Sequence, residues 1–145
     1  MAERFFDGDR ERVVILPGNH DVCLNDVMAS VQRIEIPIES AMKAKLVAEL
    51  FASRSDLRWS WREMCFFRIT NHRMYRDRFR YFASTYSSFY QGKRTYQLAP
   101  EQQFDVFDFD HLGFCVVALN SCFNNDPLRR SGEFHPDTLT EACRA

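Results

Sequence analysis

Two stretches of the chain show the hydrophobic pattern of β-structure. Residues 12–17 read Arg-Val-Val-Ile-Leu-Pro, and this apolar run predicts a short strand that is buried on both faces. Further along, Phe104–Phe109 and Phe114–Leu119 are two apolar-rich runs separated by Asp-His-Leu-Gly. Two such runs joined by a short loop that contains glycine predict an antiparallel hairpin over residues 104–121.

The stretch between these two regions is expected to be mainly helical. Apolar residues recur on one helical face over residues 39–53. Over residues 73–91, aromatic residues recur at helical spacing, and Gly92 follows as the expected C′ residue. Such a stripe is typical of a packing face. Its members are Tyr75, Phe79, Phe82, Tyr86 and Phe89.

Two further stretches carry weaker patterns. Residues 136–144 predict the opening turns of a helix, with Asp137 and Glu141 placed where acidic side chains complement the dipole of its amino-terminal end. Residues 57–69 carry tryptophans and phenylalanines without a clear period, so the pattern assigns them neither helix nor strand.

The composition is that of an ordinary globular domain. The chain has 145 residues, of which 46% are hydrophobic and 27% are charged. Its 19 basic and 20 acidic residues nearly cancel, so no global field favours nucleic acid or a membrane surface. The first four residues lack the basic and apolar regions of a signal peptide, and no apolar run approaches the ~20 residues that span a bilayer. We therefore expect a cytoplasmic protein without a membrane partner.

The five cysteines are scattered along the chain, and no two have the spacing of a CxxC pair. This excludes a zinc knuckle and a thioredoxin-like motif. We expect reduced and mostly buried thiols. The cysteines are Cys23, Cys65, Cys115, Cys122 and Cys143.

The run Gly18-Asn19-His20-Asp21 carries the clearest chemistry. A strand that ends in this run would present it at its carboxyl end, where open α/β sheets place their active sites. Glycine lets the backbone approach a metal or phosphate closely, and the asparagine oxygen is a neutral, hard ligand for a divalent cation. Histidine can donate a hydrogen bond or a proton to a phosphoryl oxygen, and the following aspartate can orient its ring. Together these groups would polarise a phosphate.

The run from Val13 to Val22 resembles the Gly-Asn-His-Asp block of the calcineurin-like metallophosphoesterases. The resemblance implies hydrolysis of a phosphate ester by a hydroxide bound to two divalent metal ions, which would be manganese, iron or zinc. It implies that Asn19 ligates a metal and that His20 hydrogen-bonds the substrate phosphate or the leaving group. It also implies that Asp21 positions His20.

The resemblance covers residues 12–25 and about 104–143. In the second region, a predicted strand, a serine-containing loop, a glycine and a helix follow one another as they do after the asparagine block in this family. We therefore expect an α/β fold, a fragment of a metallophosphoesterase-type β-sandwich flanked by helices. Residues from about 26 to 103 would form a helical insert, which could cap the site and select the substrate.

The other metal-binding blocks of this family have no counterpart in the sequence. These are Asp-x-His and Gly-Asp-x-x-Asp upstream, and a lone histidine and Gly-His-x-His downstream. Hard cations take about six oxygen or nitrogen ligands, several of them anionic, and Asn19 supplies one. We therefore expect a partial domain that a missing segment or a partner chain completes, and that is inactive alone.

Four other positions resemble site residues but are expected to be structural. Gly8-Asp9 indicates a turn. His72 lies among arginines, which disfavour a cation, and His111 falls in the predicted hairpin loop. His135 precedes a proline at a helix start, where capping or simple exposure is expected.

A second hypothesis is a non-catalytic binding module or an inactive fragment. Basic residues alternate with aromatic residues near the predicted helix at 73–91, as they do on surfaces that bind nucleic acid. The near-zero net charge favours the other explanation, that these side chains solvate the outer face of the helix. The basic residues are Arg68, Arg73, Arg76, Arg78, Arg80, Lys93 and Arg94.

Overall fold

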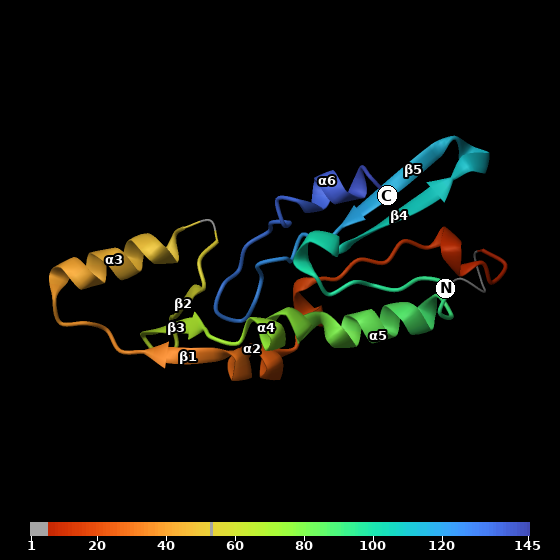
Figure 1. Ribbon diagram of the computed structural model, residues 1–145. Helices are drawn as coiled ribbons and strands as arrows, with labels where there is room; N and C mark the ends of the chain where they lie inside the picture. Colours follow the sequence, from red (N-terminus) through yellow and green to blue (C-terminus); the bar gives the residue numbers. More distant parts are fainter. Residues whose placement is uncertain (1–5, 53) are drawn as a thin grey trace.

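Two small antiparallel sheets and several helices make up the protein, whose computed structural model describes residues 6–52 and 54–145 (Figure 1). The expected mixed α/β class is confirmed. The strands are β1 (Val31–Ile34), β2 (Leu57–Ser60), β3 (Cys65–Ile69), β4 (Phe104–Phe109) and β5 (Phe114–Leu119). The α-helices are α2 (Leu24–Ser30), α3 (Ser40–Leu50), α4 (His72–Arg76), α5 (Arg80–Phe89) and α6 (Thr138–Ala142). Single 3-10 turns are η1 (Arg10–Arg12), η2 (Asn19–Asp21), η3 (Asp77–Phe79), η4 (Pro100–Gln102) and η5 (Asp110–Leu112).

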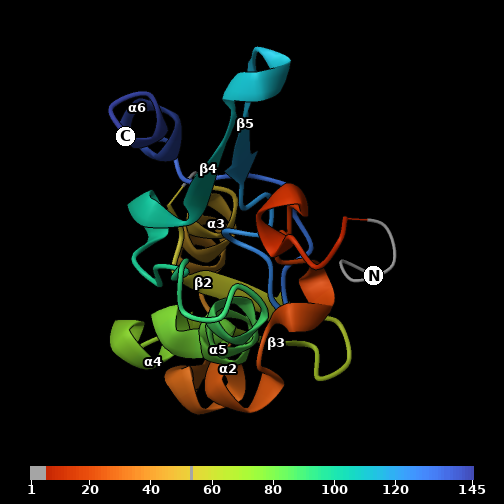
Figure 2. The same ribbon diagram turned by 90° about the vertical axis from the view of Figure 1, so that its right-hand side faces the viewer.

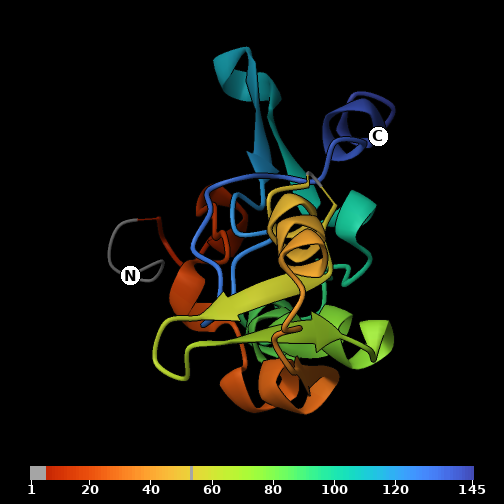
Figure 3. The same cartoon turned by 90° about the vertical axis from the view of Figure 1, so that its left-hand side faces the viewer.

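The predicted hairpin is confirmed in β4 and β5. The two strands pair antiparallel from Phe104 opposite Leu119 to Phe109 opposite Phe114. Gly113 closes the loop with a φ of 70°, a left-handed conformation that glycine adopts without steric cost. The tip of the hairpin projects away from the helices beneath it (Figure 2 and Figure 3).

The prediction of a strand over residues 12–17 is wrong. The run is extended after η1 but belongs to neither sheet. Val14 and Leu16 are 36% and 45% exposed, whereas Ile15 packs against the core beside α5. Only one face of the run is therefore covered, and not both as its apolar sequence suggests.

Hydrogen bonding explains why this run is not a strand. In the part of the chain that the structure describes, β4 and β5 pair only with each other, and the run does not pair with the outer edge of either strand. The carbonyl oxygen of Val13 instead accepts a hydrogen bond from the hydroxyl of Tyr90 in the turn after α5. A side chain thus satisfies a backbone group that a strand would pair with its neighbour.

Residues 26–103, expected to be mainly helical, also contain a three-stranded antiparallel sheet in the order β1-β3-β2. Val31 of β1 lies opposite Ile69 of β3, and Leu57 of β2 lies opposite Arg68. Strands β2 and β3 are buried along nearly their whole length and so lack the alternation that identifies a half-exposed strand. Helix α3 lies next to β2, and α2 lies next to β1 (Figure 3).

Helices are present in all three stretches where they were predicted, but their bounds and burial differ from the prediction. Helix α3 lies within the stretch predicted over 39–53, of which Ser53 is outside the described residues. Its apolar face is not buried, and Met42 and Val47 are 51% and 47% exposed. The helix predicted over 73–91 consists of α4, η3 and α5, and α6 confirms the helix predicted near the end of the chain.

Helix α5 ends in a Schellman motif one residue earlier than predicted. Gln91 takes the C′ position with a φ of 56°, and Gly92 follows it. The amide of Gln91 donates to the carbonyl of Ser88 at 3.2 Å, and that of Gly92 donates to the carbonyl of Ser87 at 2.8 Å. These bonds satisfy carbonyl groups that the end of the helix leaves unpaired.

The aromatic stripe is a packing face, as predicted. Phe82 and Tyr86 belong to the main core, which lies between α5 and the β4–β5 hairpin (Figure 1). Tyr75 packs instead in a second cluster with Val27 and Ile69. The buried members of the main core are Phe82, Tyr86, Tyr90, Tyr96, Phe107 and Ala118.

All five cysteines carry free thiols. Cys65 and Cys122 are buried, but Cys115 and Cys143 are exposed, so the expectation of mostly buried thiols is wrong for those two. Across the described ranges, the helices are too short or too polar to cross a membrane.

Candidate functional site

The Gly-Asn-His-Asp run forms the 3-10 turn η2 between the extended N-terminal run and α2. The side chains of Asn19, His20 and Asp21 are all exposed. The amide of Gly18 donates to Oδ2 of Asp21 at 2.8 Å, and the amide of Asp21 donates to the carbonyl of Gly18 at 3.1 Å. The two bonds close the turn on itself.

A hollow of about 360 Å³ lies beside this turn. His20 and Asp21 line it, together with apolar residues of the extended run and one face of α5. Asn19 lies on the same turn but outside the lining of the hollow. The structure thus brings His20, predicted to contact the phosphate, and Asp21, predicted to position His20, to one concave surface, and it leaves the predicted metal ligand Asn19 outside the lining.

The turn does not by itself make a site for metal ions. Among the described residues, no group of three or more histidine, cysteine, aspartate or glutamate side chains is arranged to hold a metal. A pair of divalent cations needs several anionic ligands. Any such ions at Asn19 would therefore need ligands from outside these residues.

Two of the four other sequence candidates make a local structural hydrogen bond. The turn predicted at Gly8-Asp9 is confirmed, with the Asp9 side chain capping η1 through the amide of Glu11 at 3.1 Å. His135 lies just before α6, where its Nδ1 accepts from the amide of Asp137, the N-cap residue, at 3.3 Å. His111 is exposed at the hairpin tip. His72 lies 3.6 Å from a carboxylate oxygen of Asp56.

Most of the basic residues near α4 and α5 are paired with carboxylates, which reduces the positive field that nucleic acid would meet. Arg78 is an exception because it is buried, with 2% of its surface exposed. The ion pairs are Arg68 with Glu49, Arg76 with Asp77 at 3.5 Å, Arg80 with Asp26 at 3.0 Å, Lys93 with Glu11 at 3.7 Å, and Arg94 with Asp105 at 2.9 Å.

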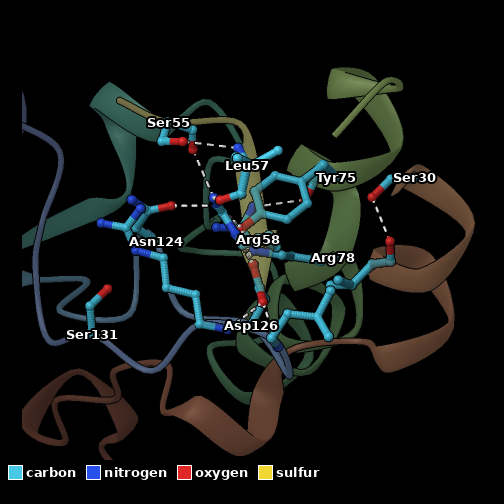
Figure 4. Close-up of polar contacts among 12 residues, drawn as sticks. Ser30, Ser55, Leu57, Arg58, Tyr75, Arg78, Asn124, Asp126 and Ser131 are labelled. Carbon is cyan, nitrogen blue, oxygen red and sulfur yellow. Dashed lines mark hydrogen bonds and ion pairs between the residues drawn. The ribbon is translucent and has the colours of Figure 1, made fainter. Parts of the chain in front are cut away.

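A buried polar network centres on Arg58 of β2 (Figure 4). Its Nε donates to Oδ2 of Asp126 at 2.7 Å, and its Nη2 donates to the Tyr75 hydroxyl at 2.9 Å and to Oδ1 of Asn124 at 2.7 Å. Its Nη1 donates to the carbonyls of Ser55 and Leu57. All five N–H donors of this guanidinium therefore have partners.

Both carboxylate oxygens of Asp126 also have hydrogen-bond partners. Its Oδ2 also accepts from the Tyr75 hydroxyl at 2.7 Å, and its Oδ1 accepts from the amides of Leu128 and Arg129 at 2.7 and 2.9 Å. Burial alone would lower the pKa of Arg58, but the charges and hydrogen bonds of Tyr75 and Asp126 outweigh it and raise that pKa above its ordinary value. The network holds Arg58 charged in the interior.

Arg78, from η3, lies next to this network and forms no ion pair with a carboxylate among the described residues (Figure 4). Its Nη1 donates to the carbonyl of Tyr75 at 2.7 Å, and its Nη2 donates to the carbonyl of Phe123. The guanidinium carbon lies 4.1 Å from the centre of the Tyr75 ring. Its Nε is buried with no hydrogen-bond partner among the described residues. Burial lowers the pKa of Arg78, yet a guanidinium stays charged at neutral pH.

A cavity of about 420 Å³ opens beside Arg58 and Arg78. Most of its wall comes from the start of β2 and the segment before it, from the α4–η3 region, and from the residues that follow β5, and Ile69 of β3 and Pro100 of η4 complete it. Arg54, Arg73 and Arg76 line it from exposed positions. Within the described residues, this cavity and the hollow beside the Gly-Asn-His-Asp turn share no lining residue.

The sequence does not reveal this second site. Arg58 and Asp126 lie 68 residues apart, and no motif surrounds either of them. Arg73, Arg76 and Arg78 belong to the basic group noted from the sequence, but the structure buries one and turns two toward a cavity. An arginine inside an otherwise apolar stretch, as at Leu57-Arg58-Trp59, is the one signal that points to a buried ion pair.

Comparison of this chain with protein-family models, with curated proteins and with solved structures finds no match. Its function is therefore inferred from its own residues.

Proposed function

We propose that the chain is part of a metal-dependent phosphoesterase that hydrolyses a phosphate ester. The observation that carries the proposal is the run Gly18-Asn19-His20-Asp21, whose three polar side chains stand exposed on one closed turn beside a hollow. We further propose that the complete domain is a metallophosphoesterase-type β-sandwich, and that a missing segment or a partner chain supplies its remaining strands and ligands. The free thiols of all five cysteines support a reducing, cytoplasmic location.

Each residue of the turn has its own part in the proposal. Asn19 offers a neutral amide oxygen to a divalent cation. His20 lines the hollow and would donate a hydrogen bond or a proton to a phosphoryl oxygen of the substrate. Asp21 holds the amide of Gly18, so it would position its neighbour through the backbone of the turn and not through the imidazole ring. The chain thus supplies one wall of the site.

A binding module for nucleic acid is the less well supported alternative. Five of the seven basic residues that suggested it are paired with carboxylates, and a sixth, Arg78, is buried. Such residues release few counterions from a nucleic acid, so they would contribute little to its affinity.

Titration of the isotope-labelled chain with Mn²⁺, followed by NMR, tests the metal role of Asn19. We expect paramagnetic broadening of the amides of residues 18–21, which Asn19→Ala abolishes. The matched control is Asn25→Ala, which removes an exposed amide on α2 and should leave the broadening unchanged. Broadening centred elsewhere, or unchanged in Asn19→Ala, would overturn the assignment.

Hydrolysis of p-nitrophenyl phosphate in the presence of Mn²⁺ tests whether the chain is sufficient. We expect little turnover by the isolated chain because the described residues do not complete a coordination sphere. Strong turnover that disappears in Asn19→Ala would support the reaction class but would show that the site is complete in this chain.

A further inference from the structure

The cavity beside Arg58 and Arg78 has the properties of a ligand site that is separate from the Gly-Asn-His-Asp turn. We propose that it binds a small organic phosphate, a phosphomonoester that carries an apolar group. The proposal does not rest on the phosphoesterase function, because the two sites share no residue and no metal is involved.

The first argument is a charge imbalance in the interior. Two buried guanidinium groups, those of Arg58 and Arg78, lie beside one buried carboxylate, that of Asp126. Asp126 forms its ion pair with Arg58, and the hydrogen bonds of Arg78 go to neutral carbonyl groups. A buried cation without a counterion is costly, so one positive charge beside the cavity remains to be compensated. A bound anion would compensate it.

The second argument is the charge at the rim. Arg54 and Arg73 line the cavity, and within the described ranges no carboxylate lies within 4.0 Å of either side chain. Arg76 adds a third rim guanidinium, which is 3.5 Å from the carboxylate of Asp77. Among the described residues, Asp56 is the one acidic residue of the lining, and it faces His72 at 3.6 Å. The excess of positive charge suits a doubly charged phosphate better than a singly charged carboxylate.

Arginine is also the side chain that best fits this ligand. Its planar fork of donors matches two oxygens of a phosphate at once, and it is less strongly hydrated than lysine. In the part of the chain that the structure describes, the lining contains five arginines and no lysine. Several guanidinium groups around one cavity can therefore hold the three terminal oxygens of a phosphomonoester.

The third argument is the apolar part of the wall and the size of the cavity. Ile69, Pro100 and Phe123 line the same space as the arginines. A volume of about 420 Å³ is far larger than a phosphate ion needs and falls in the range of small-molecule sites. The apolar surface would pack against an organic group attached to the phosphate, which distinguishes the ligand from inorganic phosphate.

Isothermal titration with phenyl phosphate in the presence of EDTA tests the proposal. We expect saturable binding that weakens as salt rises, because the ligand is held partly by exposed charges. The double variant Arg73→Gln/Arg76→Gln should weaken binding roughly tenfold or more, since it removes two charge-assisted contacts. The amides that shift in NMR spectra should cluster at residues 72–78 and not at residues 18–21.

The control is Arg33→Gln, which removes one positive charge from an exposed position on β1, away from the cavity lining. It should leave the affinity within about twofold of the parent, because binding depends on local contacts and distant charges are screened. Absence of saturable binding, or equal affinity of the double variant and the control, would overturn the site. Equal affinity for phenyl phosphate and inorganic phosphate would overturn the role of the apolar wall. Amide shifts confined to residues 18–21 would place the phosphate at the other site and overturn the proposal.

Discussion

Arg58 and Asp126 form a buried ion pair, with Nε of Arg58 2.7 Å from Oδ2 of Asp126 and their side chains 1% and 0% exposed. The two residues lie 68 positions apart, one on β2 and the other in the segment after β5. Tyr75 of α4 bridges them through its hydroxyl. The pair therefore joins the three-stranded sheet, α4 and the C-terminal segment into one packed unit (Figure 4).

Removal of the Asp126 charge should be strongly destabilising. Asp126→Asn keeps the shape of the side chain but leaves Arg58 without its counterion in the interior. Breaking a buried pair in this way costs about 3–5 kcal/mol of the free energy of unfolding. Urea denaturation measures this difference.

The exposed pair of Arg144 and Glu141 is the matched control. Its N–O distance is also 2.7 Å, but its side chains are 69% and 38% exposed. Glu141→Gln should cost less than about 1 kcal/mol because water screens and replaces the lost contact. If Asp126→Asn fails to fold, Asp126→Glu, which keeps the carboxylate charge, should be less destabilising, and the cost of the missing charge is then taken from the difference between the two variants in the yield of folded protein. Equal costs for the buried and the exposed pair would contradict the assignment.

The hairpin offers a second matched comparison, between Phe107 and Phe114. Phe107 of β4 is 1% exposed and belongs to the main core, whereas Phe114 of β5 is 49% exposed. Phe107→Ala should cost about 3–5 kcal/mol because it leaves a cavity in the core. Phe114→Ala should cost less than half as much. Thermal unfolding of the two variants measures this difference. Similar unfolding midpoints would mean that Phe107 is not a core residue.

The elements that the sequence predicts correctly are those that local chemistry determines. The β4–β5 hairpin needs only two adjacent apolar runs and a glycine that can adopt a positive φ at position 113. The aromatic stripe over residues 75–89 likewise shows its period within one continuous segment. The two strands of the hairpin are close neighbours in the sequence, and the spacing of the aromatic residues shows which face of the helix is buried.

The elements that the sequence predicts wrongly depend on distant partners. The run 12–17 has the composition of a strand, but whether it becomes one depends on an edge offered by another segment. The sheet of β1, β2 and β3 joins segments on both sides of α3, and its buried strands show no alternation. Apolar content alone therefore does not determine which segments pair.

The two candidate sites also differ in how far apart their residues lie in the sequence. The Gly-Asn-His-Asp run is visible in the sequence because four adjacent residues carry its chemistry. The arginine-lined cavity draws on several separated parts of the chain, and the pair of Arg58 and Asp126 beside it has no local pattern. Only folding brings these charges together, so only the structure reveals them.

The ion pair between Glu49 of α3 and Arg68 of β3 predicts an acid-sensitive contact. Nη2 of Arg68 donates to Oε2 of Glu49 at 2.9 Å, and Nη1 donates to the other carboxylate oxygen. The hydrogen bonds from Arg68 lower the pKa of Glu49 below its ordinary value of 4.5. Because the folded pKa is lower than the unfolded one, the stabilisation is present at neutral pH and is lost as the pH falls below 4.5 toward the folded value.

Glu49→Gln should therefore reduce stability at pH 7 and lose its effect in acid. Both side chains are 37% exposed, so the loss at pH 7 should be less than about 1 kcal/mol. Urea denaturation at pH 7 and at lower pH measures this change. Glu35→Gln, at an exposed position before α3, controls for the removal of a charge. A deficit that is the same at both pH values would mean that the carboxylate charge does not stabilise the contact.

Tyr86 predicts the opposite dependence, a loss of stability in alkali. Its hydroxyl donates to Oδ2 of Asp105, whose Oδ1 accepts from Arg94 at 2.9 Å, and the tyrosine is 1% exposed. Burial, and then the hydrogen bond to Asp105 and its charge, raise the pKa of Tyr86 far above the ordinary value of 10.0. The folded pKa is higher than the unfolded one, so this stabilisation is complete below pH 10.0 and is lost as the pH rises above it.

Tyr86→Phe measures two contributions separately, the hydrogen bond to Asp105 at neutral pH and the ionisation of the hydroxyl at high pH. At pH 7 it should cost about 1 kcal/mol, because one hydrogen bond is lost while Arg94 still holds Asp105. Above pH 10, the variant should lose stability less steeply than the parent, by up to about 1.4 kcal/mol per pH unit, because one tyrosine that ionises on unfolding is gone. Tyr81→Phe, at a side chain that is 60% exposed, is the control and should preserve the parental slope. Denaturation at a series of pH values from 7 to 11 measures both quantities, and equal slopes for Tyr86→Phe and the parent would mean that the buried hydroxyl does not resist ionisation.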